Sequence, residues 1–254
     1  MKTTYRHLAC GLVAILFTLT ACTTARQEFE ITSSLIPVDA RWDKYPQPEM
    51  EAIVNKYKTS VDSIMGTVVG QSKQYMEPDR PGTPLTNLTA DIVKTAVQTH
   101  CSQPVDFAVT NIGGIRNPLL QGEITLGEIY SIFPFDNTLC LVKLTGADVR
   151  ALFDIIVSRE GEAVSREVHI TGKAGKCIDA TIGGKPIDDN RIYTIATIDY
   201  VANGGDHMTP LLNAVERINS SVFMRDAVID YVKRETRANR AIGSIPEERI
   251  ILTD

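Results

Sequence analysis

The centre of the chain reads Asp106-Phe-Ala-Val-Thr110 and continues at once as Asn111-Ile-Gly-Gly-Ile-Arg116. The first five residues form a brief apolar run that is typical of a buried strand, and the run stops where the loop begins. The Gly-Gly pair in the loop indicates unusual backbone angles or close approach by a ligand. We therefore expect a buried strand that presents an amide, backbone N–H groups and a guanidinium, a set suited to anionic or polyol oxygens.

Helices and strands interleave on both sides of this stretch. Apolar spacings of three and four predict helices, and short apolar runs between Gly, Asp and Asn turns predict strands. The expected helices cover residues 50–64, 85–100, 125–132, a segment ending at 156, and 221–236; the expected strands begin at 66 and cover 106–110, 138–144, 168–170, 177–182 and 193–198. Because strict βαβ repetition is missing, we predict an α+β fold, a single layered domain of mixed sheet and helices over residues 48–254.

The N-terminal residues are typical of an exported protein. Residues 1–7 carry positive charge, and Leu8 to Thr20 is an apolar run of about a dozen residues, shorter than the roughly 20 that span a bilayer. The ending Leu19-Thr-Ala-Cys22 resembles a bacterial lipobox. We expect a signal peptide over residues 1–21, a lipid anchor on Cys22 and a polar tether over residues 22–47. The alternative is ordinary cleavage after Ala21, which would leave a free cysteine.

Net charge and cysteine content exclude some classes. The formal net charge is −5 and no Lys/Arg block occurs, so binding to polymeric nucleic acid is not expected. Beyond the signal and Cys22, the cysteines are Cys101, Cys140 and Cys177, an odd number that permits at most one disulfide. None lies in a Cys-x-x-Cys pair, and we expect them to be structural.

Motifs for self-contained catalysis are missing from the sequence. After Cys22 the histidines are His100, His169 and His207, without the spacing of a zinc or di-metal site. No Gly-x-Ser-x-Gly elbow and no phosphate-binding loop of the Walker type occurs. We expect neither a metal nor a catalytic group in this chain.

Two further loops resemble ligand-binding loops. Residues 133–137 hold an aromatic in a turn, and residues 199–206 carry Tyr200 and a carboxylate across a Gly-Gly turn. Each loop alone can be a tight turn, a core aromatic or a helix cap. Together the three loops offer two aromatics to sandwich a flat ring, an amide for its edge, and Arg and Asp for sugar hydroxyls or phosphate. The candidate binding residues are Asn111, Gly113, Gly114, Arg116, Phe135, Tyr200, Asn203, Gly204, Gly205 and Asp206.

From Gly66 to Asp254 the chain resembles the C-terminal domain of the 5′-nucleotidase family. The resemblance is carried, in order, by Asn-x-Gly-Gly-x-Arg at 111–116, Gly-x-Ile-Thr at 122–125, Pro-Phe-x-Asn at 134–137, Leu-x-Gly at 144–146 and Asn-Gly-Gly-Asp at 203–206. In that family an N-terminal metallophosphoesterase domain holds two metal ions, and the C-terminal domain holds the nucleoside. The resemblance implies that Phe135 and Tyr200 stack on the base, Asn111 meets its edge, Arg116 faces ribose or phosphate, and Asp206 binds ribose hydroxyls.

Three features depart from the family pattern. Arg80 lies near, but offset from, an arginine that precedes the first helix of many members, so it is carried over as an offset candidate for binding. Ser165-Arg166 replaces a Ser-Gly and would crowd a backbone position near the ligand. Tyr200 replaces the commoner Phe and keeps the ring.

The interval between Cys22 and Gly66 is too short for a metallophosphoesterase domain. The sequence therefore predicts the nucleotide-binding subunit of a split phosphohydrolase, anchored in the cell envelope and inactive alone. A separately encoded metallophosphoesterase would supply the divalent metals. The alternatives are a stand-alone binder of nucleosides or nucleotides, and a scaffold whose pocket has decayed.

Overall fold

A computed structural model describes residues 31–45 and 47–253 of the chain. The expected signal peptide and Cys22 lie outside these residues. The contacts divide the described residues into two units, one ending at Glu51 and the other beginning at Ala52. In the first unit, residues 31–45 are exposed and contain one short 3-10 helix, η1 (Trp42–Lys44). None of the helices within the described ranges has the length and apolar character needed to cross a bilayer.

Helix α2 (Pro48–Met65) confirms the helix expected from residue 50 to 64. Its spacing of apolar side chains places them on one stripe, because residues three and four apart share a helix face. The part of this stripe that lies in the second unit is solvent-exposed. Between 48% and 58% of the surface of each of its side chains is exposed; these are Ile53, Val54, Tyr57, Val61 and Ile64. An amphipathic helix normally buries such a stripe, so α2 presents an apolar surface that the rest of its unit does not cover.

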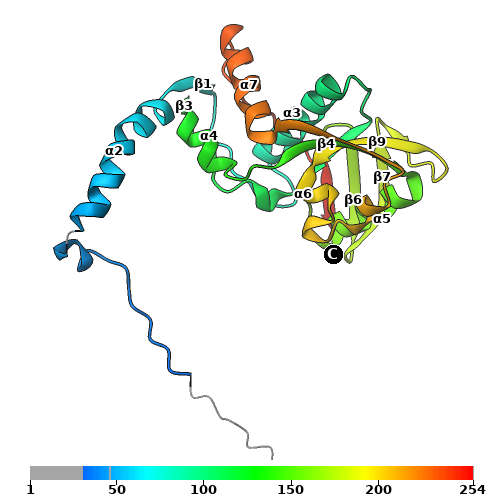
Figure 1. Cartoon of the computed structure of the whole chain (residues 1–254). Coiled ribbons are helices and arrows are strands. Elements are labelled where there is room, and N and C mark those ends of the chain that lie inside the picture. The colour runs from blue at the N-terminus through cyan, green and yellow to red at the C-terminus, as the bar shows by residue number, and fades with distance from the viewer. Residues whose placement is uncertain (1–30, 46, 254) are drawn as a thin grey trace, which may run out of the picture. The chain divides into compact units, whose positions relative to one another are not determined.

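A five-stranded sheet forms the centre of the second unit (Figure 1). Its order is β10 (Glu216–Phe223), β4 (Thr138–Thr145), β9 (Ile192–Ile198), β2 (Phe107–Thr110) and β5 (Ala163–Val164). Strand β9 pairs antiparallel with β4 and parallel with β2, and β2 pairs antiparallel with β5. All four residues of β2 are buried, which agrees with the continuous apolar run of its sequence.

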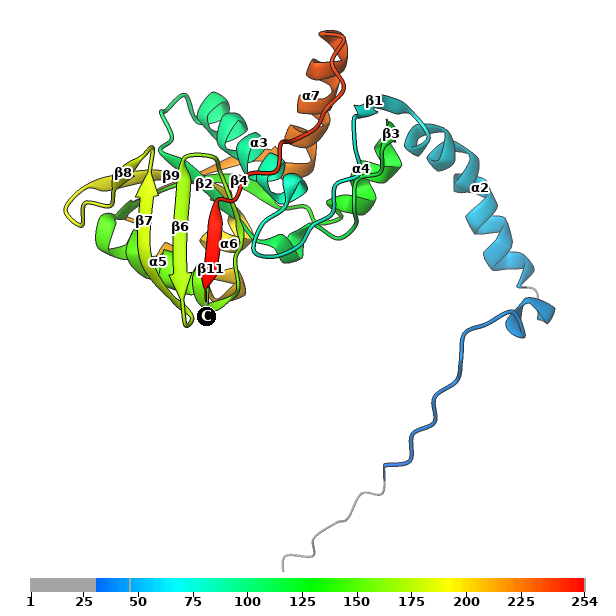
Figure 2. The ribbon, with the colours of Figure 1, turned by 180° about the vertical axis from the view of Figure 1, so that it is seen from behind.

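A second sheet lies beside the first and has the order β11 (Ile250–Thr253), β6 (Val168–Lys173), β7 (Lys176–Ile182) and β8 (Lys185–Pro186). Figure 2 shows β11, close to the C-terminus, alongside β6, and their pairing is parallel. Helix α5 (Gly146–Ser158) contacts strands of both sheets. Its Phe153 meets Phe107 of β2 edge to face, with ring centroids 5.6 Å apart. The two sheets therefore share one core through α5.

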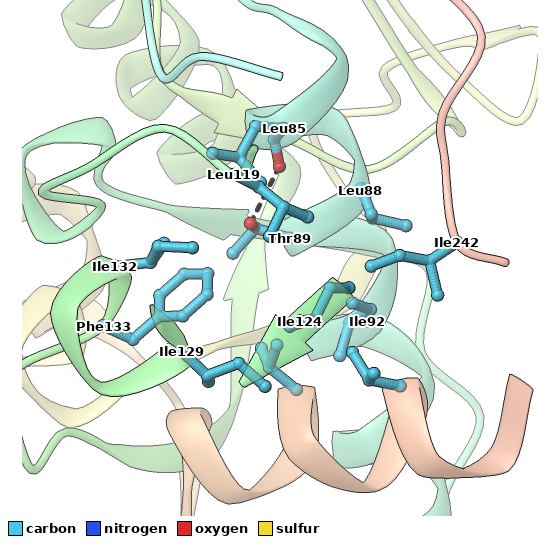
Figure 3. A pocket seen from close by; sticks show the side chains of 12 residues that line it. Leu85, Leu88, Thr89, Ile92, Leu119, Ile124, Ile129, Ile132, Phe133 and Ile242 are labelled. Atoms are coloured by element: carbon cyan, nitrogen blue, oxygen red, sulfur yellow. Dashed lines mark hydrogen bonds between the residues drawn. The ribbon is translucent and has the colours of Figure 1, made fainter. Parts of the chain in front are cut away.

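Three helices pack together elsewhere in this unit. These are α3 (Pro84–Cys101), α4 (Leu126–Ile132) and α7 (Met224–Arg237), and α7 contacts the other two. Helix α3 also contacts β2, β9 and β4. Near them β1 (Val68–Ser72) pairs antiparallel with β3 (Gly122–Thr125). An apolar cavity of about 20 Å³ lies among side chains from α3, α4, α7 and β3. Figure 3 shows the side chains that line it. Its one hydroxyl, on Thr89, donates to the Leu85 carbonyl at 2.8 Å, so the cavity offers a water molecule no free partner.

The α+β prediction is confirmed, and most expected elements occur within a few residues of their predicted bounds. The predicted start of the last helix, at residue 221, is wrong. Residues 216–223 form β10, and α7 begins only at Met224. Pairing with β4 extends to Phe223, opposite Thr138, and this tertiary contact overrides the local helical spacing. Strands β3, β5, β8 and β11 were not expected, because each has two to four residues, too few to show a period.

Cys101, Cys140 and Cys177 are all free, so the one disulfide that the sequence permits does not form among the described residues. Cys140 is buried in β4, and its thiol donates to the Asn219 Oδ1 at 3.1 Å. Cys101 and Cys177 are half-buried. Burial raises the pKa of all three thiols, which lowers the fraction of reactive thiolate at neutral pH.

The cavity between the helices makes Ile129 a sensitive position. Ile129 is 1% exposed and lines the cavity, so Ile129→Ala would enlarge an existing void. We expect the free energy of unfolding in urea to fall by about 2–5 kcal/mol. Ile178 of β7 is 60% exposed, and Ile178→Ala is the matched control, with an expected change within about 0.5 kcal/mol. Equal effects of the two changes would show that the helices do not form a packed core.

Candidate functional site

The register of the five-stranded sheet brings four loops to one edge. Strands β2 and β9 are parallel neighbours, so the loops that follow Thr110 and Ile198 leave the sheet on the same side. Strand β4 runs the other way, and its Leu139 pairs with Ile198, so the loop preceding β4 lies at this edge too. Ala163 at the start of β5 pairs with Thr110. The four loops, which are far apart in sequence, therefore lie next to one another at this edge of the sheet.

A cleft of about 350 Å³ lies at this edge. Its lining is Asn111, Gly113, Gly114, Arg116, Phe135, Asn137, Tyr200 and Asp206. The rings of Phe135 and Tyr200 are 47% and 44% exposed, whereas Asn111 is 6% exposed. The cleft thus has aromatic groups at its surface and an amide in its depth, and its volume is in the range of small-molecule sites.

Asn111 is held in one orientation. Its Nδ2 donates to the Asp206 Oδ2 at 2.7 Å, which directs the amide oxygen elsewhere. That Oδ1 is buried and has no hydrogen-bond partner among the described residues. A buried acceptor without a partner costs about 1–3 kcal/mol, which a ligand N–H could recover. At the exposed rim, the Arg116 Nη1 donates to the Gly113 carbonyl at 3.1 Å.

The turn that follows β9 positions Asp206 and Tyr200. After the short helix α6 (Asp199–Ala202), Asp206 adopts a left-handed conformation with φ of 53°. A Cβ on Gly205 would lie 2.5 Å from the Tyr200 Cε1, so the ring packs where only glycine leaves room. Asn203 does not line the cleft, because its Oδ1 accepts from the Arg217 Nη1 at 2.7 Å. Gly204 and Gly205 also lie outside the lining and shape the turn instead.

A buried carboxylate lies behind the cleft. The Glu162 side chain has no exposed surface, and its Oε2 accepts from the Ile112 backbone N–H at 2.7 Å. Its Oε1 accepts from the Arg80 Nη2 at 2.8 Å and from the Arg159 Nε at 3.0 Å. Arg80 therefore faces Glu162 and does not line the cleft. The Arg159 Nη2 lies 3.6 Å from the Asp206 Oδ1, which links the carboxylate to the cleft wall.

A second buried charge holds the loop of Phe135. Arg225, at the start of α7, donates to the Phe133 carbonyl at 3.1 Å and to the Asp136 Oδ1 at 2.5 Å. Its guanidinium also lies 4.1 Å from the centre of the Tyr130 ring. Phe133 itself is buried in the core, so the turn is fixed on both sides and Phe135 projects into the cleft.

Ser165-Arg166 does not crowd the cleft, contrary to the expectation. The Arg166 guanidinium turns to Asp91, with Nη2 to Oδ2 at 2.9 Å, and is absent from the lining. The Ser165 Oγ accepts from the Ala108 N–H and donates to Glu167. Burial alone would raise the pKa of Glu167, but hydrogen bonds from Lys94 and Ser165 outweigh it and lower that pKa.

Sequence reasoning missed Asn137, Glu162, Arg159 and Arg225. Asn137 belongs to a loop that was singled out, but its role as lining was not expected. Glu162 and Arg159 lie in a run of charged residues that has the appearance of an exposed turn. Within residues 31–45 and 47–253, no group of three or more His, Cys, Asp or Glu is placed to hold a metal ion.

Comparisons with known proteins find similar sequences over the region that holds the cleft. A family model described as 5′-nucleotidase, C-terminal domain, matches residues 68–213, which contain every cleft-lining residue. The chain is 33% identical over 200 residues to the endonuclease YhcR of Bacillus subtilis (strain 168), covering 74% of this chain and 16% of that protein. It is 23% identical over 195 residues to the protein UshA of Yersinia enterocolitica, covering 74% of this chain and 35% of that protein.

The fold is also found in a solved structure. The 5′-nucleotidase precursor from Thermus thermophilus superposes with a TM-score of 0.69 at 22% identity, over 80% of this chain and 43% of that one. This likeness shows the fold. The chain thus spans less than half the length of each of these proteins.

The close packing of Tyr200 on Gly205 can be tested directly. Because a methyl group at position 205 would overlap the ring, we expect Gly205→Ala to lower the free energy of unfolding by about 1–3 kcal/mol. Gly243→Ala is the matched control, since a Cβ there would meet its nearest neighbours at 3.5 Å, an ordinary contact. If both variants unfold at the same urea concentration as the unaltered chain, the packing described for Tyr200 is wrong.

Proposed function

The chain belongs to the family of 5′-nucleotidase C-terminal domains, and we propose that its cleft binds a nucleotide or nucleoside. The observation that carries the proposal is the buried, unpaired Oδ1 of Asn111 in a cleft that two half-exposed aromatic rings also line. A planar base with an N–H group at its edge would satisfy both features. It would stack on the rings and donate to the buried oxygen.

The polar groups of the cleft fit the rest of a nucleotide. Asp206, on the same wall as Asn111, would accept hydrogen bonds from ribose hydroxyls. The Arg116 guanidinium at the rim is suited to phosphate oxygens, which it can bind with two parallel N–H groups. Phe135 and Tyr200 would each contribute about 1–3 kcal/mol of stacking.

Calorimetric titration of AMP, UDP-glucose and adenosine tests the binding role. We expect Phe135→Ala to raise the Kd for AMP roughly 5- to 150-fold, because one stacking surface is lost. Tyr75→Ala is the matched control, since Tyr75 is 53% exposed and does not line the cleft. Absence of any heat change with the unaltered chain would contradict the binding role and favour a decayed pocket.

Hydrolysis is assigned in this proposal to a separate metallophosphoesterase. The chain spans 35% of UshA, and its described residues offer no group of three or more His, Cys, Asp or Glu that could hold a metal ion. The exposed apolar stripe of α2, directly before the region that matches the family model, is the surface suited to that partner. Anchoring through Cys22 in the cell envelope would concentrate the two subunits on one surface.

The α2 stripe provides the test of this partnership. Co-expression with a metallophosphoesterase encoded beside this protein, followed by co-purification and phosphate release from a nucleotide panel, measures assembly and activity. We expect Val54→Glu with Val61→Glu to abolish co-purification and leave the Kd for AMP unchanged, because charge is placed on the apolar stripe. Asn55→Glu with Thr59→Glu alters the opposite face and is the matched control.

Two results would contradict the split-enzyme proposal. One is hydrolysis of AMP by the purified chain with added divalent metal, lost in a Phe135→Ala and Asp206→Ala double variant. The other is binding of AMP with no metallophosphoesterase that co-purifies or adds activity, which would indicate a stand-alone binder.

A further inference from the structure

We propose that Glu162 is the positioning residue of the cleft, and that its negative charge holds Asn111 and Asp206 in the arrangement that binds ligand. This inference rests on the proposed binding of a nucleotide or nucleoside. Glu162 itself is absent from the cleft lining, so its influence runs through its neighbours.

The first connection runs through the backbone. Glu162 Oε2 accepts from the N–H of Ile112 at 2.7 Å, and Ile112 directly follows Asn111. A hydrogen bond from a backbone N–H to a carboxylate is stronger than a neutral one, and this one is buried. It therefore fixes the loop at the point where Asn111 leaves β2.

The second connection runs through Arg159. The Glu162 Oε1 accepts from the Arg159 Nε at 3.0 Å, and the Arg159 Nη2 lies 3.6 Å from the Asp206 Oδ1. The other oxygen of Asp206 accepts from the Asn111 Nδ2 at 2.7 Å. Glu162, Arg159, Asp206, Asn111 and Ile112 thus form a closed ring of contacts, in which the two residues that would meet the ligand are held from both sides.

The charge of Glu162 matters as well as its shape. Its two oxygens face three donors: the Ile112 N–H, Arg159 and Arg80. A glutamine would turn an N–H₂ group toward one of these donors, so one connection must break. The two arginines would also lose the buried carboxylate that neutralises them, and Arg159 would be free to draw Asp206 away from the cleft.

The experiment compares the full chain with Glu162→Gln by hydrogen exchange and by AMP titration. We expect the Ile112 amide to exchange at least about 10-fold faster and the Kd for AMP to rise about 10- to 150-fold, as for loss of a charged hydrogen bond. Asp91→Asn is the matched control, because Asp91 pairs with the buried Arg249 at 2.9 Å, outside the cleft lining. Asp91→Asn should leave the exchange rate of the Ile112 amide and the Kd for AMP within about twofold of their values in the unaltered chain.

A second variant separates positioning from stability. Arg159→Gln keeps Glu162, Arg80 and the Ile112 bond, so it should weaken AMP binding while the Ile112 amide stays protected. The double variant that carries both Arg159→Gln and Glu162→Gln should bind AMP no more weakly than Glu162→Gln alone, because both residues hold Asp206 through the same set of contacts. If Glu162→Gln does not fold, Arg159→Gln alone decides, and unchanged AMP affinity in it overturns the proposal.

Unchanged exchange at Ile112 together with unchanged AMP affinity in Glu162→Gln would also overturn it. If the unaltered chain binds no nucleotide, the proposed function fails, yet the exchange of Ile112 still reports whether Glu162 positions the loop. The two failures are therefore distinguishable.

Discussion

The pairing of β9 with a strand on each side is the constraint on which the rest of the site depends. Because β9 is parallel to β2 and antiparallel to β4, the end of β9, the end of β2 and the beginning of β4 all lie at one edge of the sheet. Asn111, Tyr200 and Phe135 each follow or precede one of these strands within a few residues. A shift of one residue in either pairing would turn every side chain of β9 to the other face and separate the three loops.

The cleft separates contact groups from the charges that support them. The rings and Arg116 are at the surface, where a ligand could reach them, whereas Glu162 and Arg225 are buried behind the loops. Buried ion pairs add little net stability when compared with apolar packing, but removing one partner is costly. Such pairs are suited to fixing a loop in one arrangement, and a fixed arrangement reduces the ordering cost that binding must overcome.

The exposed stripe of α2 and the cleft belong to different parts of the proposed activity. Every residue that lines the cleft comes from the region that the family model matches. The stripe has the opposite property, because its apolar side chains lack cover within the described residues of their unit. In the proposed function, the cleft would position a nucleotide for chemistry performed elsewhere, and the open helix face would contact the partner that performs it.

Local sequence patterns are sufficient to predict the α+β class, most helices and strands, and the loops that hold Asn111, Phe135 and Asp206. These follow from local signals: apolar period, Gly-Gly turns and the order of short motifs. Contacts between distant residues are needed to see that Arg80 faces Glu162, that Asn203 bonds to Arg217, and that residues 216–223 pair as a strand. The burial of Glu162 shows why local patterns miss such contacts: its hydrogen bond to Ile112 and the neighbouring pairing of β5 with β2 join residues about fifty positions apart, beyond the reach of any local pattern.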